Sequence, residues 1–253
     1  PLYSSAASDV YKRQSEDTFT TDVTNFLNVE SFQEEGTTDE ITSRVVAEID
    51  FSEDLMGYFA LAKGFKPGGS NLTFGFDDDN APPMVFPTFE AETVDSVEFG
   101  LKSVFADGAA RANIAVFSYT YENLQFQATD PDIYRGGVAN IPESEMSGLE
   151  IEFTGFLSDS LSLDMNLAFL DSEVTSDYEV LDNVDAYPYF FGEEDIRYGL
   201  RENVKGNQLA KTPELTADIT LKHETNLASG NSLTTLVPVS YTHLRAHETS
   251  LQL

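Results

Sequence analysis

The stretch Leu161-Ser-Leu-Asp-Met-Asn-Leu-Ala-Phe169 decides the fold, because its odd positions are all apolar while its even positions are mostly polar or small. Successive side chains of an extended strand point to opposite faces, so this alternation gives one strand an apolar face and a polar face. The same alternation recurs in residues 149–153 and 214–223, and helical periodicity is hard to find in the chain. The sequence therefore predicts an all-β protein.

Period-two alternation marks about nine candidate strands, and short and long connections follow one another strictly. The strands are residues 24–33, 41–51, 55–65, 94–105, 111–127, 146–156, 160–174, 213–227 and 231–237. Short turns at 52–54, 106–110, 158–159 and 228–230 alternate with long polar or Gly/Pro-rich stretches at 66–93, 128–145 and 175–212. We therefore expect an antiparallel meander with the three long loops at one rim.

Long strands joined in this way favour a transmembrane β-barrel. Such barrels have tight turns on one side of the membrane and long loops on the other, and their strands alternate between lipid and lumen. Most of the candidate strands exceed the roughly five or six residues usual in globular sheets. A polar lumen also accounts for charged residues in mid-strand, such as Glu150, Glu152 and Asp164. A soluble all-β module stays open as an alternative, and the absence of tryptophan supports it.

The composition excludes several classes of function. A net charge of −30 at pH 7 argues against binding nucleic acid, which needs basic surface. Because the chain has no cysteine, it has neither a disulfide framework nor a thiolate metal site. An apolar content of 41% argues against disorder. No apolar run approaches the roughly 20 residues of a membrane-spanning helix.

Both ends of the chain read as translated sequencing-library adapters. Ser4–Gln14, SSAASDVYKRQ, can be encoded by a transposase adapter read forwards, and residues 239–248, VSYTHLRAHE, by a sequence that resembles the reverse complement of its partner. We therefore expect residues 1–14 and 238–253 to be adapter-derived and not native, and residues 15–237 to be an internal fragment of a longer protein. His243 and His247 share the spacing of a zinc-binding helix, but they fall in this flank, and we predict no metal site there.

Four further stretches lie at strand ends or inside strands. They are Ala62-Lys-Gly-Phe-Lys-Pro-Gly-Gly-Ser-Asn71, Glu92-Thr-Val-Asp-Ser-Val-Glu-Phe-Gly-Leu-Lys102, Met146-Ser-Gly-Leu-Glu-Ile-Glu152 and Gly206-Asn-Gln-Leu-Ala-Lys-Thr-Pro213. In this order and spacing they resemble the β-barrel of TonB-dependent outer-membrane receptors, over about residues 42–237. One departure is Ala91, where the family usually has proline. The resemblance implies an open fragment of a large transmembrane β-barrel.

The resemblance implies structural roles for the motif residues, because glycine and proline suit strand ends and bends in a barrel wall. These residues are Gly64, Phe65, Lys66, Gly68, Gly69, Asn71, Glu98, Gly100, Lys102, Gly148, Glu150, Gly206, Asn207 and Pro213. Aromatic and basic residues in the last long loop are candidates for ligand contact through stacking and charge. They are Tyr187, Tyr189, Phe190, Phe191, Arg197 and Arg201.

The resemblance also implies transport rather than catalysis, in the outer membrane of a Gram-negative bacterium. Receptors of this kind import a scarce nutrient, such as a siderophore, haem, cobalamin or an oligosaccharide. The expected partners are outer-membrane lipid, the small-molecule nutrient, and the TonB energy-transducing complex, which a missing amino-terminal part of the receptor would contact. We expect no cofactor. The alternatives are a passive porin or structural outer-membrane barrel, and a soluble all-β adhesion module.

Two acidic motifs invite a chemical interpretation that we do not favour. Residues 77–80, Asp-Asp-Asp-Asn, have the oxygen density of a calcium site but lack the glycine and the distal glutamate of an EF-hand loop. Glu150 and Glu152 are paired carboxylates, as in glycosidases, but residues two apart on a strand simply share a face. We predict a solvated loop tip for the first motif and no catalytic residue in the second.

Overall fold

The computed structural model describes residues 4–20, 33–71, 88–129, 136–181 and 201–243, with side-chain detail from residue 39 onward. Among these residues, no helix is both long enough and apolar enough to span a membrane.

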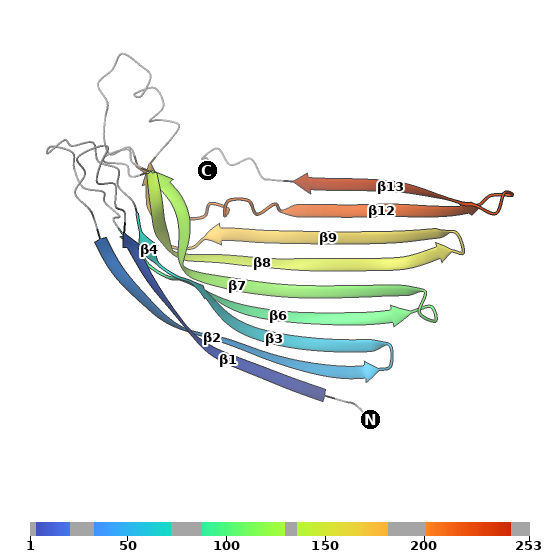
Figure 1. Ribbon diagram of the computed structural model, residues 1–253, viewed down its shortest axis with the longest axis horizontal. Coiled ribbons are helices and arrows are strands. Elements are labelled where there is room, and N and C mark those ends of the chain that lie inside the picture. The colour runs from blue at the N-terminus through green and yellow to red at the C-terminus, as the bar shows by residue number, and fades with distance from the viewer. Residues whose placement is uncertain (1–3, 21–32, 72–87, 130–135, 182–200, 244–253) are drawn as a thin grey trace, which may run out of the picture.

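A nine-stranded antiparallel sheet makes up most of the described chain (Figure 1). In spatial order its strands are β1 (Ser4–Thr20), β2 (Gln33–Ser52), β3 (Leu55–Lys66), β6 (Glu92–Phe105), β7 (Ala110–Thr129), β8 (Gly136–Ser158), β9 (Leu161–Val174), β12 (Leu215–Asn226) and β13 (Ser232–His243). Two small ribbons stand apart from this sheet: β4 (Gly69–Ser70) with β5 (Thr88–Phe89), and β10 (Glu179–Leu181) with β11 (Arg201–Asn203). The all-β antiparallel meander predicted from the sequence is confirmed.

One predicted boundary needs correction, and one candidate strand lies almost wholly outside the described residues. The candidate strand 24–33 lies outside the described residues except for Gln33, and the first strand of the sheet is β1 instead. The stretch 128–145 is not mainly loop, because β7 continues to Thr129 and β8 already begins at Gly136. The pairing of β7 with β8 passes over one position, Asn123 opposite Pro142, and then resumes in the same register. Proline has no backbone N–H to donate, so the ladder skips that pair without ending there.

The register divides the sheet into an apolar and a polar face. Residues directly opposite each other in an antiparallel pair point to the same side. One row across the sheet is apolar: Ile49, Gly57, Leu101, Ile114, Ile151, Leu167, Ala217 and Tyr241. The neighbouring row on the other face is mostly polar: Asp50, Met56, Lys102, Asn113, Glu152, Asn166, Asp218 and Ser240. Leu163, Met165 and Leu167 thus share a face opposite to that of Asp164 and Asn166, as the alternation predicts.

Large apolar side chains on this sheet are exposed. Phe99 is 55% exposed, Leu101 47% and Val239 57%, so no second layer of the described chain covers the apolar face. From Leu161 to Phe169 the apolar band measures about 27 Å along the strand, or about 20 Å across a membrane once a strand tilt of roughly 40° is allowed for. This height is of the same order as the apolar band of an outer-membrane barrel, about 25 Å.

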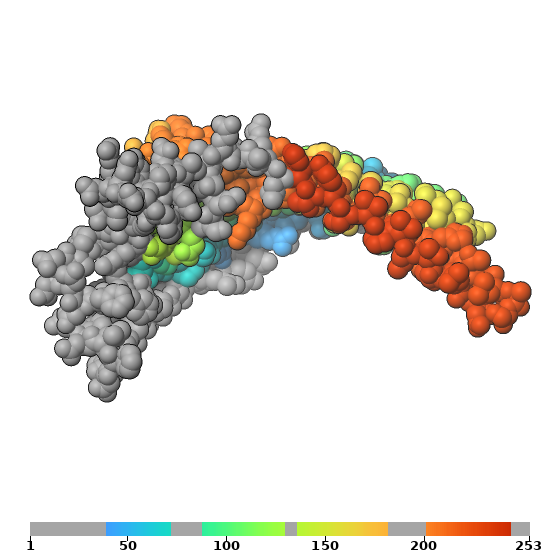
Figure 2. All heavy atoms as spheres, turned by 90° about the horizontal axis from the view of Figure 1, so that it is seen from above, coloured from blue at the N-terminus to red at the C-terminus, as the bar shows by residue number. Residues whose placement is uncertain are grey.

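The sheet is arched and open (Figure 2). β1 and β13 are its two outermost strands, and among the described residues they do not pair with each other. The short turns after β2, β6, β8 and β12 all lie at one end of the sheet, while β4, β10 and β11 belong to the opposite end, called here the loop-end rim (Figure 1). The sheet therefore has the arched, open geometry expected for part of the wall of a large β-barrel.

The two outermost strands of the sheet include residues predicted to be adapter-derived. β1 includes residues 4–14, and β13 continues to His243 with every one of its residues exposed. The non-native origin of residues 1–14 and 238–253 stays a prediction.

Candidate functional site

The motif Glu98-Phe-Gly-Leu-Lys102 forms the contact site, called here the seat, of the Tyr58 side chain on the polar face. Gly100 lies directly opposite Tyr58 in the register, and a Cβ at Gly100 would collide with the tyrosine ring. The Tyr58 hydroxyl donates a hydrogen bond to Glu98 Oε1 at 2.5 Å, and Lys102 Nζ lies 5.3 Å from the ring centroid. Glu98, Gly100 and Lys102 share a face because they are two residues apart on β6. Glu98, Gly100 and Lys102 thus each contact a different part of the Tyr58 side chain.

Gly148 repeats this arrangement on the next hairpin. It pairs with Phe117, and a Cβ there would lie 2.5 Å from Phe117 Cζ and 2.8 Å from the Phe169 carbonyl oxygen. Phe117 begins an aromatic column along β7: its ring stacks on Tyr119 at 4.9 Å, and Tyr119 meets Tyr121 edge-on at 6.5 Å. An aromatic ring over a strand glycine restores the packing that the glycine lacks. Gly100 and Gly148 therefore each leave room for an aromatic ring on the polar face.

Carboxylates gather on the same face. Glu150 pairs with Ala115, and Glu152 pairs with Asn113, whose Nδ2 donates to Glu152 Oε2 at 2.9 Å. Acidic residues on this face extend across the sheet: Glu48, Glu98, Glu150, Glu152, Asp164 and Asp218. Removing carboxylates from water costs free energy unless a cation or a hydrogen-bond donor pairs with them. The polar face thus suits contact with water, and its charge attracts cationic groups.

At the loop-end rim, the motif Lys66-Pro-Gly-Gly-Ser-Asn71 carries the chain from β3 into the β4–β5 ribbon. A Cβ at Gly68 would lie 2.5 Å from the Phe89 carbonyl oxygen, so a larger residue would force the ribbon apart. Asn71 Nδ2 donates to the Val138 carbonyl at 2.7 Å, and the Val138 N–H donates to Asn71 Oδ1 at 2.7 Å. A single amide side chain thereby replaces a pair of sheet hydrogen bonds and fixes the end of β4 to β8.

Three more amide side chains tie the other arm of this ribbon to the sheet. Gln125 Nε2 donates to the carbonyl oxygens of Pro67 at 2.8 Å and Glu90 at 3.0 Å. Asn140 accepts from the Glu90 N–H at 2.7 Å and donates to the Glu90 carbonyl at 3.1 Å. Asn123, in the left-handed conformation with φ 55°, donates to the Glu90 carboxylate at 3.1 Å. Side chains thus supply hydrogen-bond partners for the Pro67 and Glu90 backbone groups, which lie outside the main ladder.

The motif beginning at Gly206 turns the chain back onto β9. Gly206 has φ 81°, which glycine adopts without strain, and its N–H donates to the Val174 carbonyl at 2.8 Å. The Val174 N–H donates in turn to the Asn207 carbonyl at 2.9 Å. Pro213 directly precedes the pairing of β12 with β9, a position where a missing N–H costs little. These bonds close a small core of Ile141, Val174 and Val204, each at most 2% exposed.

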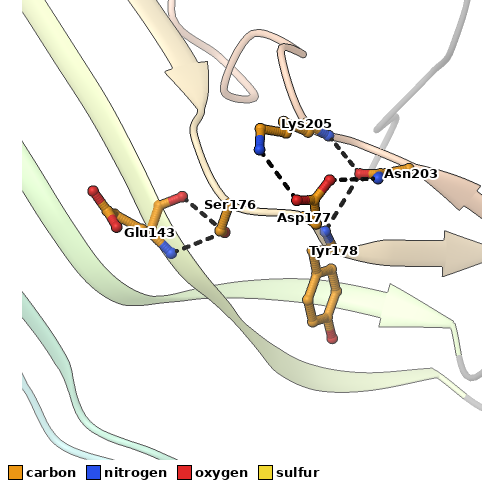
Figure 3. Close-up of polar contacts among 6 residues, drawn as sticks. All are labelled: Glu143, Ser176, Asp177, Tyr178, Asn203 and Lys205. Atoms are coloured by element: carbon orange, nitrogen blue, oxygen red, sulfur yellow. Dashed lines mark hydrogen bonds and ion pairs between the residues drawn. The ribbon is translucent and has the colours of Figure 1, made fainter.

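A polar cluster supports the β10–β11 ribbon beside this core (Figure 3). Asn203 Nδ2 donates to Asp177 Oδ1 at 2.9 Å, and Lys205 Nζ lies 3.1 Å from Asp177 Oδ2. These two hydrogen bonds lower the pKa of Asp177, that from Asn203 having the larger effect. The neighbouring Tyr178 packs edge-on against Phe126 at 5.7 Å, and burial raises the pKa of its hydroxyl. Ser176 joins the cluster to β8 by donating to the Glu143 carbonyl at 3.1 Å.

A cavity of about 470 Å³ opens between the loop-end rim and the polar face. Its lining combines charged, amide and aromatic side chains from β3, β6 and β7 with residues 209–212. The polar contributors are Lys66, Glu92, Tyr121, Gln125, Gln127 and Lys211. Apolar side chains, among them Leu124, Phe126 and Ile141, line the rest of the cavity. Among the described residues, no group of histidine, cysteine and acidic side chains is arranged to hold a metal ion.

The predicted ligand-contact residues lie mostly beyond what the structure describes. Tyr187, Tyr189, Phe190, Phe191 and Arg197 fall outside the described residues, as does the acidic motif at 77–80. Arg201 opens β11 and is exposed. Several of the predicted structural residues lie in strands, including Gly64 and Phe65, which pair with Val94 and Thr93 on β6, whereas Gly206 and Asn207 lie between β11 and β12. Their structural role stays a prediction.

Sequence reasoning missed the partners of these motifs. Tyr58, Phe117 and Gln125 contact the motif residues, but none of the three belongs to a motif itself. The signal that could have found them is the register, because Tyr58 and Phe117 are the cross-strand partners of strand glycines.

Comparisons with known proteins agree with this geometry. A family model described as TonB dependent receptor-like, beta-barrel matches residues 11–246. The probable TonB-dependent siderophore receptor PiuA of Acinetobacter baumannii is 30% identical over 120 residues, which cover 47% of this chain and 15% of that protein.

Two solved receptor structures have a similar fold. The ferric yersiniabactin uptake receptor FyuA of Yersinia pestis superposes with a TM-score of 0.65 at 16% identity, over 95% of this chain and 31% of its own. The ferric preacinetobactin receptor BauA of Acinetobacter baumannii superposes with a TM-score of 0.59 at 15% identity. The superposition covers 94% of this chain and 30% of BauA. The chain thus spans less than a third of the length of each of these proteins.

Proposed function

The chain belongs to the TonB-dependent receptor family, within its β-barrel, and we propose that it forms part of the wall of an outer-membrane receptor that imports a scarce nutrient. The proteins of this family are outer-membrane β-barrels of Gram-negative bacteria, and the relatives found are transport receptors rather than enzymes. In this proposal the apolar face meets lipid and the acidic face lines the lumen.

The observation that carries this proposal is the exposure of a continuous apolar face on a curved sheet. Phe99 and Leu101 are about half exposed, although fully burying one such side chain contributes about 1.5–3 kcal/mol. A water-soluble protein rarely leaves a contiguous apolar patch of this extent uncovered. The other face carries Glu98, Glu150 and Glu152, which require water. Lipid on one side and a wet lumen on the other satisfy both faces.

We propose a siderophore-type ferric complex as the nutrient. Support comes from the descriptions of PiuA as a probable siderophore receptor, of FyuA as a ferric yersiniabactin receptor and of BauA as a ferric preacinetobactin receptor. The rim cavity adds chemical support, because amide, tyrosine and lysine side chains around Gln125 can bind the oxygen atoms of a chelated complex. We further propose that TonB supplies the energy, through an amino-terminal part of the receptor that contacts the energy-transducing complex.

The test begins with the gene. Sequencing outward from the coding DNA for residues 15–237 should give a full-length receptor with an amino-terminal plug. That receptor is then expressed in a bacterium that lacks its own siderophore receptors, and uptake of ⁵⁵Fe bound to a panel of siderophores is measured with and without TonB. We expect uptake of at least one ferric siderophore that stops when TonB is deleted. Uptake that continues without TonB would indicate a passive porin, and the receptor proposal would be rejected.

A further inference from the structure

A hollow in the apolar face lies beside the turn between β2 and β3. Gly57, the only residue of its cross-sheet row without a side chain, stands between Ile49 and Leu101 in the register. A Cβ at Gly57 would lie 2.8 Å from Phe51 Cε2 and 3.4 Å from Leu101 Cδ2. The cavity measures about 380 Å³ and crosses four strands, β2, β3, β6 and β7. It is a depression in the apolar face, remote from the polar cavity at the loop-end rim.

Three phenyl rings border this hollow. Phe59 and Phe99 form a tilted pair with ring centroids 4.7 Å apart, and both line the cavity. Phe51 sits at a β-bulge between Asp50 and Ser52, and its ring passes over Gly57. A bulge re-aims the side chain it carries, so the bulge accounts for the position of the Phe51 ring. Phe51 and Phe99 are 53% and 55% exposed, and the hollow is therefore open on the apolar side.

The lining selects an apolar and flexible occupant. Apart from Tyr58, every lining residue is aliphatic, phenyl or glycine, and the Tyr58 hydroxyl is bound to Glu98 on the other face. A peptide segment lying in this hollow would bring N–H and C=O groups that find no hydrogen-bond partner there, which is costly. A hydrocarbon chain has no such requirement. Its conformational freedom also lets it follow an irregular groove between three rings.

The position of the hollow identifies the side of the membrane. Gly57 follows the turn at Glu53 and Asp54 by three residues, which places it about 10 Å from that end of the sheet. This end carries the short turns (Figure 1), which in outer-membrane barrels face the periplasm. The hollow is therefore continuous with the proposed lipid-facing band at the depth of acyl chains in the periplasmic leaflet.

We propose that this hollow is a binding site for one acyl chain of a phospholipid of the periplasmic leaflet. The proposal rests on the proposed function, since it requires the apolar face to lie in a bilayer. It assigns Gly57 the role of leaving room for the Phe51 ring at the edge of the hollow, and Phe51, Phe59 and Phe99 the role of holding the chain.

Photo-crosslinking tests this site directly. The chain is reconstituted in liposomes containing phosphatidylglycerol with a diazirine on one acyl chain, and labelled residues are identified by mass spectrometry. We expect labelling to concentrate on Phe51, Phe59 and Phe99. Gly57→Leu should fill the hollow and lower their labelling about tenfold, the effect of displacing roughly two buried methylene groups. Ala217→Leu is the matched control, because it also introduces a leucine on the apolar face, outside the hollow.

Each outcome has a distinct meaning. Equal labelling along the apolar face, unchanged by Gly57→Leu, would show ordinary contact with surrounding lipid and overturn the site. Loss of labelling on adding lipopolysaccharide would overturn the assignment to phospholipid. Absence of labelling from the whole apolar face would instead reject the lipid-facing role in the proposed function. Ala47→Leu, which fills the hollow from β2, gives a second test if Gly57→Leu does not fold by circular dichroism.

Discussion

Replacing Gly100 by alanine should displace Tyr58 from its seat and destabilise the sheet. A Cβ at Gly100 overlaps the tyrosine ring, so the ring has to swing away from β6. The variant then loses the hydrogen bond from the Tyr58 hydroxyl to Glu98 and the contact of the ring with Lys102. A hydrogen bond to a charged group contributes about 1.5–3 kcal/mol and an exposed cation–π contact about 0.5–1 kcal/mol. Because the site is partly exposed, we expect a total loss of about 2 kcal/mol.

The assay is equilibrium unfolding by guanidinium in detergent micelles, followed by far-ultraviolet circular dichroism. Gly136→Ala is the matched control: it is also a strand glycine, but its Cβ would meet nothing closer than the Ala128 carbonyl oxygen at 4.0 Å. Gly136→Ala should be neutral or slightly stabilising, because alanine restricts the unfolded chain.

A double-mutant cycle separates the clash from other effects. In Tyr58→Ala the ring is already absent, so adding Gly100→Ala should cause almost no further loss. The reasoning is refuted if Gly100→Ala matches Gly136→Ala in stability, or if its cost persists unchanged in the Tyr58→Ala background.

Three further predictions concern the rim and the ends of the chain. Asn71→Ala removes both amide hydrogen bonds to Val138 and should speed hydrogen exchange of the Val138 amide roughly tenfold, for a local loss of about 1.4 kcal/mol; unchanged exchange would contradict the role of this side chain. The hydrogen bonds to Asp177 lower its pKa below the ordinary 3.8, so they should stabilise the β10–β11 ribbon above pH 3.8. This stabilisation should be lost as the pH falls through the lowered pKa. Asp177→Asn should therefore abolish the pH dependence of the protection of this ribbon against hydrogen exchange. Deleting residues 1–14 and 238–253 should leave the unfolding midpoint in micelles unchanged if both are adapter-derived, and a marked fall would show that they belong to the native sheet.

The sheet could be predicted from the sequence because its signal is local. In Leu161–Phe169 every second residue is apolar, and this pattern alone fixes which side chains share a face. Short turns such as that at residues 158–159 then fix the antiparallel order. The extension of β7 and β8 into 128–145 could not be predicted in this way. There Pro142 interrupts the ladder, and Asn71 on another strand supplies the bonds to Val138, which no local pattern reveals.

The site was predictable only in part for a related reason. Gly100 and Gly148 could be recognised as structural positions, but the reason for each glycine is an aromatic ring on a neighbouring strand. Tyr58 and Glu98 are 40 residues apart in sequence, and only the register shows that they meet. Residues 187–197, where the sequence places most candidate ligand contacts, lie outside the described residues and stay a prediction.

The central claim is that one face of this sheet meets lipid and the other meets water, and cysteine scanning along β6 tests it most directly. The chain has no cysteine of its own, so each introduced thiol is the sole site of labelling. Val97, Phe99 and Leu101 represent the apolar face, and Ser96, Glu98 and Lys102 the polar face.

Each position is replaced by cysteine in turn, and the chain is reconstituted in liposomes and labelled with an environment-sensitive bimane dye. We predict blue-shifted emission and slow reaction with a water-soluble maleimide at positions 97, 99 and 101, with red-shifted emission and fast reaction at 96, 98 and 102. Six positions that behave alike, or an alternation of the opposite sense, would contradict the account.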